Sequence, residues 1–199
     1  MDLLLGTSNE GKVMEISEGL IGLPLKILTP NILGLSEPSE ETGTTFAENA
    51  AEKARFFFER SGLPTLADDS GIIIEALQGE LGLHTRRWGA GPQANDEEWI
   101  DFFLKRMRNE MNRRARFQCV LAYIDAEDSL RTFEGICEGT ITDMLEGPYL
   151  PGLPISACFK PEGFDHVFSN LSLEEKNRVS HRGKATLRFR EFLEEKIAT

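Results

Sequence analysis

Two kinds of apolar spacing divide this chain into expected strands and helices. Short apolar runs bounded by turn-forming residues predict strands at 2–8, 25–30, 115–125 and 130–143, the last two joined by a turn at 125–129. Apolar residues repeated every three or four positions predict helices at 9–22, 46–62, 95–112 and 184–198. The polar, Gly- and Pro-containing segments 31–43 and 147–163 are expected to be loops.

The segment 64–77 carries polar residues between two apolar runs. Its sequence, PTLADDSGIIIEAL, favours two strands joined by a turn at 68–71. Further upstream, Thr45 and Glu48 have the spacing of a capping box, which predicts that a helix begins directly after Thr45. Helical spacing also predicts two buried stripes. In the helix 95–112 the stripe contains Trp99, Phe102, Phe103 and Met107, and in the helix 184–198 it contains Leu187, Phe189, Phe192, Leu193 and Ile197.

The mixture of strands and helices predicts a single α/β domain over residues 1–199. The two long neighbouring strands predict antiparallel pairing, and there are too few β-α-β alternations for a doubly wound sheet. No apolar run approaches the roughly 18 residues that a membrane span needs. No basic segment followed by a long apolar one opens the chain, so we expect neither a secretory signal nor a membrane partner.

Composition narrows the classes of partner and compartment. The net charge of −11 argues against nucleic-acid binding, which depends on a positive surface, but it permits a small anionic substrate where lysines and a metal converge. Cys119, Cys137 and Cys158 show neither the spacing of a metal site nor a disulfide framework. We therefore expect buried, reduced thiols in a cytoplasmic protein.

The segment LLLGTSNEGKV contains most of a phosphate-binding P-loop. Gly6, Gly11 and Lys12 have the G-x-x-x-x-G-K spacing, after an apolar run and before a helical pattern. A P-loop then needs Ser or Thr to hold magnesium, whereas this chain has Val13, which offers no hydroxyl. The pattern therefore counts against a P-loop phosphotransferase, although Lys12 beside a strand end can still bind phosphate.

Two acidic pairs are the candidate metal ligands. Glu40-Glu41 precedes a predicted helix, and Asp68-Asp69 lies between the apolar runs TLA and GIII. Each pair alone is also compatible with solvated loop charge. Carboxylates between buried runs, however, require a partner ion or hydrogen bonds, and magnesium prefers a few hard oxygens completed by water and substrate phosphates.

Cationic groups recur at three places along the chain. Lys12 follows the first predicted strand, and Lys53 shares a mostly apolar helix face with Asn49, where it either snorkels to solvent or points into an anion-binding cleft. His181, Arg182 and Lys184 follow Ser180, a candidate N-cap of the last helix, and a helix start favours anions. Together with the acidic pairs, these groups predict a metal-dependent site for a nucleotide or another polyphosphate.

Six motifs in this chain resemble the inosine/xanthosine triphosphate pyrophosphatase family, enzymes that remove non-standard purine nucleotides. The motifs are TSNEGK, EETGTTFAENAAEKA, ADDSGIIIEAL, RRARFQCVLAY, FEGICEGTI and EKNRVSHRGKA, in this order between residues 7 and 185. The resemblance implies an elongated α/β fold with a long central mixed sheet flanked by helices, two lobes and a cleft between them, usually as a homodimer. It also implies magnesium-dependent hydrolysis of a nucleoside triphosphate to the monophosphate and pyrophosphate.

The same resemblance implies a role for each site residue. Asp69 would be the general base that activates water, and Lys12 and Lys53 would neutralise the phosphates. The metal would be held by residues from the set Glu40, Glu41, Asp68 and Asp69. The substrate would be bound by Thr7, Ser8, Asn9, Lys12, Asn49, Lys53, Ser70, Arg87, Lys176, His181 and Arg182, the last three at the base and sugar end.

Two segments depart from the family pattern. In ELGLHTRRWGAG, Leu81 stands in place of Pro and Thr85-Arg86-Arg87 in place of Ser-Ala-Arg, so Arg87 is retained. In the base pocket, GLPISACF replaces G-F-G-Y-D-P-x-F, with Leu153 in place of the stacking Phe and Ser156 in place of Asp. The expected substrate is a keto purine nucleotide. The alternatives are relaxed base specificity or a nucleotide-binding sensor without turnover.

Overall fold

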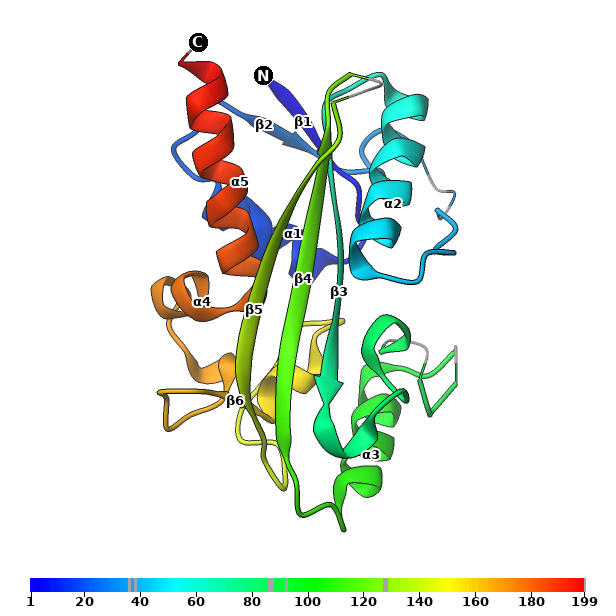
Figure 1. The fold of residues 1–199 in the computed structure, drawn as a ribbon, viewed down its shortest axis with the longest axis vertical. Helices are drawn as coiled ribbons and strands as arrows, with labels where there is room; N and C mark the ends of the chain where they lie inside the picture. Colours follow the sequence, from blue (N-terminus) through cyan, green and yellow to red (C-terminus); the bar gives the residue numbers. More distant parts are fainter. Residues whose placement is uncertain (36, 38, 86–87, 92, 127–128, 199) are drawn as a thin grey trace.

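A six-stranded mixed sheet forms the centre of the protein (Figure 1). The computed structural model describes residues 1–35, 37, 39–85, 88–91, 93–126 and 129–198. The strands, in the spatial order β2-β1-β3-β4-β5-β6, are β1 (Asp2–Leu5), β2 (Lys26–Leu28), β3 (Thr65–Ile74), β4 (Arg114–Ile124), β5 (Arg131–Ile141) and β6 (Phe159–Pro161). β1 runs parallel to β2 and β3, and the pairs from β3 to β6 are antiparallel, which confirms the predicted α/β class with substantial antiparallel pairing.

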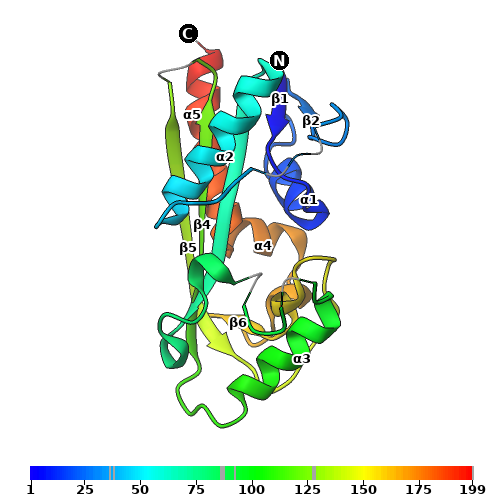
Figure 2. The same cartoon turned by 90° about the vertical axis from the view of Figure 1, so that its right-hand side faces the viewer.

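Helices cover both faces of the sheet. The α-helices of the described residues are α1 (Glu10–Gly19), α2 (Phe46–Ser61), α3 (Asp96–Met107), α4 (Leu173–Val179) and α5 (His181–Ile197). α2 packs on one face of β3 and β4, while α1 and α5 pack on the other, so the long strands lie between them (Figure 2). α3 covers the opposite end of the sheet from the chain termini (Figure 1). Short 3-10 helices lie at Glu75–Leu77, Gly82–His84, Pro154–Ala157 and Phe168–Asn170.

Local capping explains where the predicted helices begin and end. The capping box of α2 is confirmed: Thr45 Oγ1 accepts the Glu48 N–H at 3.1 Å, and Glu48 Oε2 accepts the Thr45 N–H at 3.1 Å. The same helix ends at Gly62, whose φ of +65° is the left-handed conformation that favours glycine. The predicted N-cap at Ser180 is confirmed: it accepts the Gly183 N–H at 2.9 Å, so α5 begins at His181, three residues before the start that the apolar pattern predicts.

The predicted strand–turn–strand unit at 64–77 is wrong. Thr65–Ile74 form one continuous strand, and each of its residues pairs with β4 in antiparallel register. A D-D-S-G run is typical of a turn when only local preferences act. Here the two mid-strand carboxylates are met by cations and hydrogen-bond donors from other elements, so Asp68 and Asp69 are accommodated within the sheet.

Two of the predicted core stripes are only partly buried. Trp99, Phe103 and Met107 are buried, but Phe102 is 39% exposed. In α5, Phe189 and Leu193 are fully buried, whereas Leu187 and Ile197 are 52% and 47% exposed. Neighbouring helix positions diverge by about 100°, so the face that meets the sheet is narrower than the predicted stripe. The sequence pattern does not predict α4, because its seven residues bury no apolar stripe of their own.

The molecule is elongated along β4 and β5, and both chain ends lie at the same end of it (Figure 1). A division into two lobes with a cleft between them stays a prediction. In the part of the chain that the structure describes, no helix combines the length and apolar character that crossing a bilayer requires.

Candidate active site

The candidate site lies where the edge of β3 is left uncovered. β1 pairs with β3 only at Thr65 and Leu66, because β1 ends at Leu5. From Ala67 onward no strand of the described residues covers this edge of β3, since its other neighbour is β4. Side chains from both faces of β3 can therefore reach the same space beside this uncovered edge. A cavity of about 440 Å³ is found there.

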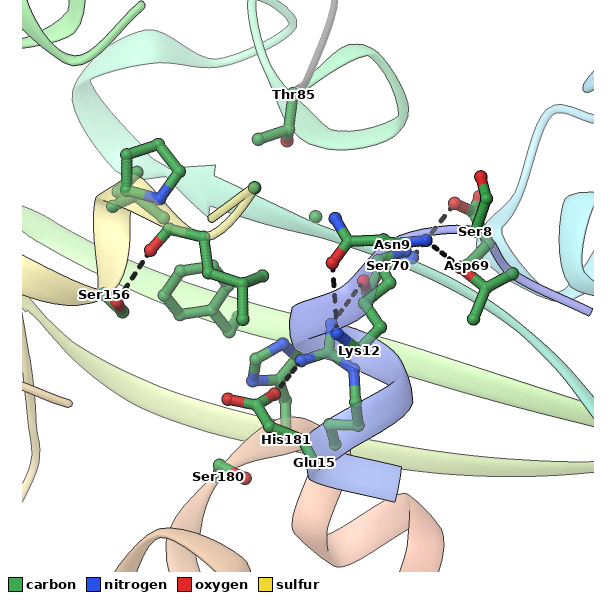
Figure 3. Close-up of a pocket in the computed structure, with 18 of the residues that line it drawn as sticks. Ser8, Asn9, Lys12, Glu15, Asp69, Ser70, Thr85, Ser156, Ser180 and His181 are labelled. Atoms are coloured by element: carbon green, nitrogen blue, oxygen red, sulfur yellow. Dashed lines mark hydrogen bonds and ion pairs between the residues drawn. The ribbon is translucent and has the colours of Figure 1, made fainter. Parts of the chain in front are cut away.

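The segment that leaves β1 forms one wall of this cavity. The Gly6 N–H donates to Leu66 O at 2.8 Å, which holds the segment against β3. Asn9 caps α1 by accepting the Lys12 N–H at 3.1 Å, and Thr7 Oγ1 accepts the Asn9 N–H at 3.3 Å. Thr7, Ser8, Asn9 and Lys12 line the cavity at the N-terminus of α1, a position that favours phosphate (Figure 3).

Gly11 serves packing rather than a P-loop. A Cβ at position 11 would lie 2.8 Å from Leu153 Cδ1 and 3.2 Å from Pro151 O, so glycine lets the segment around residue 152 approach α1. The G-x-x-x-x-G-K spacing is therefore explained by this close approach and by Lys12, whose Nζ lies 2.8 Å from Asp68 Oδ2.

Asp68 is a buried carboxylate with one oxygen in contact with a cation and a hydroxyl, and one oxygen without a hydrogen-bond partner among the described residues. Its Oδ2 is contacted by Lys12 Nζ at 2.8 Å and accepts the Ser70 hydroxyl at 3.3 Å. Burial opposes ionisation, but the surrounding cations, Lys12 first, outweigh it and hold the pKa of this carboxyl well below its usual range. Its Oδ1 is buried and has no hydrogen-bond partner among the described residues.

Asp69 points to the opposite face of β3, as strand alternation requires. Asn49 Nδ2 of α2 donates to its Oδ2 at 3.0 Å, and the Ser70 N–H donates to its Oδ1 at 3.0 Å. Burial raises the pKa of Asp69, against the opposing effect of Lys53. A carboxylate of raised pKa that lines the cavity is suited to accept a proton.

Lys53, on α2, extends to the same part of the cavity as Asp69. Its Nζ lies 2.8 Å from Glu41 Oε1 and donates to Asp68 O at 2.9 Å. Burial would lower the pKa of Lys53, but the negative charges of Asp68 and Glu41 outweigh it and raise that pKa, so the lysine stays charged. Of the predicted acidic pair, Glu41 lines the cavity, whereas Glu40 lines a separate hollow beside Thr42.

The acidic residues fit a magnesium site that a substrate would complete. No three Asp, Glu, His or Cys side chains of the described residues are gathered as a metal-binding cluster. Magnesium, however, is commonly held by one or two carboxylates together with water and substrate phosphates. Asp68 meets this requirement because its buried Oδ1 is left without a partner by the described residues, and Glu41 lines the adjoining cavity.

Glu15 is a site residue that the sequence reasoning missed. This α1 carboxylate is buried, lines the cavity, pairs with Lys176 Nζ at 2.5 Å and forms an ion pair with Arg182. Burial would raise its pKa, but the two cations, Arg182 first, lower it. The available signal was its position three residues after Lys12, on the same helix face.

His181 and Phe117 form a stacked wall at the other end of the cavity. Their ring centroids lie 4.6 Å apart at an interplanar angle of 15°, and the Phe168 ring lies beside both, 5.7 Å from Phe117 and 6.2 Å from His181. Burial, followed by the charge of Arg182, lowers the pKa of His181 well below its ordinary value, so the imidazole is neutral at pH 7. Phe117 was missed because the sequence marks it only as an inward strand residue.

Leu153 and Ser156, the two residues that depart from the family pattern in the base pocket, lie together beside this wall. The Ser156 hydroxyl donates to Leu153 O at 2.7 Å inside the 3-10 helix, and both residues line the cavity (Figure 3). Because its proton is engaged, Ser156 presents an acceptor oxygen to a ligand. Thr85 lies across the cavity and is fixed by its hydroxyl, which donates to Gly82 O at 2.6 Å. Arg87 and Arg86 lie outside the described residues.

Comparisons with known proteins agree on one family. The sequence profile of the Ham1 family matches residues 3–192. The chain is similar to a dITP/XTP pyrophosphatase of Leptospira interrogans, 41% identical over 194 residues that cover 98% of each protein. It is also similar to a dITP/XTP pyrophosphatase of Thermus thermophilus, 40% identical over 93% of this chain and 88% of the relative.

Solved structures give the same result for the fold. The Ham1 protein of Staphylococcus aureus matches with a TM-score of 0.83 and 30% identity, over 98% of this chain and all (100%) of that one. A HAM1 protein of Coxiella burnetii matches with a TM-score of 0.84 and 33% identity, over 98% of this chain and 99% of that one.

Proposed function

This chain belongs to the Ham1 family, and on that premise we propose that it hydrolyses non-standard purine nucleoside triphosphates such as dITP, XTP and ITP. The products would be the nucleoside monophosphate and pyrophosphate. The observation that carries the proposal is one cavity with two chemically different ends. At one end, Lys12 and Lys53 lie with three carboxylates, those of Glu41, Asp68 and Asp69, near the N-terminus of α1. A stacked aromatic wall with Leu153 and Ser156 forms the other end.

In this proposal Asp69 takes the proton from the attacking water. Its pKa is raised by burial, which makes it a better base than an exposed aspartate, while Lys53 limits the rise. The bonds from Asn49 and from the Ser70 N–H fix the carboxylate, so it need not reorient when water attacks.

Lys12 and Lys53 would stabilise the negative charge that builds on the phosphates. Both line the cavity, and Lys53 remains protonated because its pKa is raised by nearby carboxylates that outweigh its burial. The N-terminus of α1 and the side chains of Thr7, Ser8 and Asn9, which also line the cavity, add hydrogen-bond donors beside them. Preformed cations in a partly buried site act more strongly than the same charges in water.

Asp68 and Glu41 would hold magnesium when substrate is bound. When bound, magnesium polarises the phosphoryl oxygens and offsets their charge. The Oδ1 of Asp68, unpartnered within the described residues, supports this assignment, and Glu41, which contacts Lys53, lines the cavity beside it.

The base would occupy the end of the cavity formed by His181, Phe117, Leu153 and Ser156. Lys176 and Arg182 lie beside it, both held by Glu15. A guanidinium and an ammonium are donors without acceptors. Since keto purines present acceptor oxygens where adenine presents an amino group, these two donors support inosine and xanthosine nucleotides as substrates.

The test is pyrophosphate release from a panel of ITP, XTP, dITP, GTP, ATP and pyrimidine triphosphates, with magnesium and with a chelator. We expect release that is fastest with ITP, XTP and dITP and that requires magnesium. Equal turnover with the chelator would reject the metal assignment. Tight nucleotide binding without release of pyrophosphate would reject the enzyme and favour a nucleotide sensor.

The proposal extends to a cytoplasmic homodimer. The three cysteines are free and buried, which suits a reducing compartment. The dimer follows from the family resemblance, and light scattering at micromolar concentration tests it: the mass of one chain would reject the dimer.

A further inference from the structure

The hydroxyl of Ser70 connects Arg182 with Asp68. Arg182 donates an N–H to Ser70 Oγ at 3.0 Å, and Ser70 Oγ donates to Asp68 Oδ2 at 3.3 Å. A serine hydroxyl has a single proton. In this arrangement that proton lies on the Asp68 side, so Ser70 is oriented by two protein groups rather than left free for a ligand.

Arg182 is held from its other side by the base end of the cavity. Glu15 forms an ion pair with Arg182 and lies 2.5 Å from Lys176 Nζ. The side chains of Arg182 and Glu15 are only 3% and 10% exposed. An unbroken series of polar contacts therefore runs from Lys176 to Asp68 along the cavity wall. Its central pair, Glu15 and Arg182, is largely buried, and there the contact is stronger than in solvent.

We propose that Ser70 is a positioning residue that couples the fit of the base to the orientation of Asp68. The inference rests on the proposed function. A base edge that leaves Glu15 and Arg182 in place preserves both bonds of Ser70. A base edge that displaces the guanidinium removes the donor to Ser70 and the direct ion pair between Arg182 and Asp68 Oδ2 at 3.8 Å. The Ser70 hydroxyl is then no longer fixed toward Asp68, whose Oδ2 keeps, among the described residues, only its contact with Lys12 as a fixed restraint.

If Ser70 couples base fit to Asp68, discrimination between bases should appear in kcat rather than in KM. If Ser70 only bound substrate, its removal would raise KM. If it positions Asp68, the loss falls on kcat, because the orientation of Asp68 matters in the transition state. The loss of kcat on removing the Ser70 hydroxyl is also larger for a well-fitting base than for a poorly fitting one. With the poorly fitting base, the bond between Arg182 and Ser70 is already broken in the parent enzyme. Ser70 thus converts base recognition into a difference in rate.

The first experiment compares the parent enzyme with Ser70→Ala and Ser70→Thr, measuring kcat and KM for ITP and GTP. Removing a hydrogen bond to a charged group should lower kcat for ITP roughly 10-fold to 100-fold, leave KM within about twofold, and reduce the ITP-to-GTP ratio of kcat. Threonine keeps the hydroxyl and should restore most of the rate. A change in KM alone, or equal losses with both nucleotides, overturns the coupling.

A second variant keeps the test decisive if Ser70→Ala folds poorly. Arg182→Lys retains a positive charge beside Glu15 but replaces the two guanidinium nitrogens that contact Glu15 and Ser70 with one compact ammonium on a differently shaped stem, so the bond to Ser70 should be lost. It should show the same fall in the ITP-to-GTP ratio of kcat. Combined with Ser70→Ala, the two changes should be clearly less than additive in kcat; full additivity overturns the proposal.

The parent enzyme separates this inference from the function on which it rests. A parent that hydrolyses ITP, together with additive variants, rejects only the coupling. A parent that releases no pyrophosphate from any nucleotide rejects the proposed function and the coupling with it.

Discussion

Replacing Asp68 with asparagine tests how far one buried carboxylate stabilises the folded protein. The side chain of Asp68 is fully buried, and its Oδ2 lies 2.8 Å from Lys12 Nζ. Asparagine has nearly the same shape but no charge, so Lys12 and Arg182 lose the anion that offsets their own burial. Breaking a buried ion pair by removing one partner costs about 3–5 kcal/mol. At roughly 2–4 °C per kcal/mol for a chain of this size, Tm at pH 7 should fall by roughly 6–20 °C.

The effect of Asp68→Asn should also depend on pH. Burial opposes ionisation of Asp68, but nearby cations, Lys12 first, hold the pKa of this carboxyl well below its ordinary range in the folded state. A carboxyl with a depressed folded pKa stabilises the fold above its unfolded pKa of about 3.9, and this contribution is lost as the pH falls through the folded pKa. The free energies of unfolding of the two proteins should therefore differ most above about pH 5 and converge in stronger acid.

The assay is thermal and urea unfolding in metal-free buffer at several pH values. Asp143→Asn is the matched control, because Asp143 makes an ion pair of the same kind with Arg113 at 3.3 Å but is 85% exposed. The control should stay within about 0.5 kcal/mol of the parent. If Asp68→Asn melts within about 2 °C of the parent at pH 7, less than about 1 kcal/mol of stability is involved, and the argument from buried charge is refuted.

Three further changes test other parts of the site. Asp69→Asn should lower kcat roughly 10²- to 10⁴-fold at saturating ITP, because an amide cannot accept the proton from water; turnover at the parent rate would exclude Asp69 as the base. Magnesium should raise the Tm of the parent, since a ligand that binds only the folded state stabilises it, and Glu41→Gln should weaken that rise; equal responses would contradict a shared metal site. Leu153→Phe combined with Ser156→Asp should increase the preference for ITP over GTP in kcat/KM by about tenfold for each 1.4 kcal/mol by which the new side chains favour inosine over guanine; unchanged ratios would show that other residues read the base.

Local patterns were sufficient for most helices and strands. The capping box at Thr45 and the N-cap at Ser180 act between residues three apart, so they can be recognised before any tertiary structure is known. The apolar runs of β4 and β5 likewise predicted two strands, and these pair as expected. The segment 64–77 failed because the preference of Asp68-Asp69-Ser70-Gly71 for a turn was overridden by pairing with β4.

The candidate residues could also be named from the sequence, but their arrangement could not. Sequence order suggested that Asp68 and Asp69 act as one acidic pair, whereas strand alternation places them on opposite faces, one with Lys12 and the other with Asn49. The cavity beside them has room only because β1 ends at Leu5 and leaves the edge of β3 uncovered. Whether the edge of a strand is covered depends on the lengths of the strands next to it in space, and the sequence pattern does not show which strands those are.

The sequence by itself therefore determined the elements, their caps and the residue types that carry the chemistry, since these depend on contacts between near neighbours in the chain. Only the tertiary structure decided which charges meet. Glu15 pairs with Arg182 across 167 positions of sequence, and Ser70 reaches the same arginine across 112. Burial and the neighbouring charges together then shift the pKa values of groups such as Asp68 and Glu15. Such contacts form only when α1, α5 and β3 pack against one another, because burial and long-range charge are properties of the packed core rather than of any local segment.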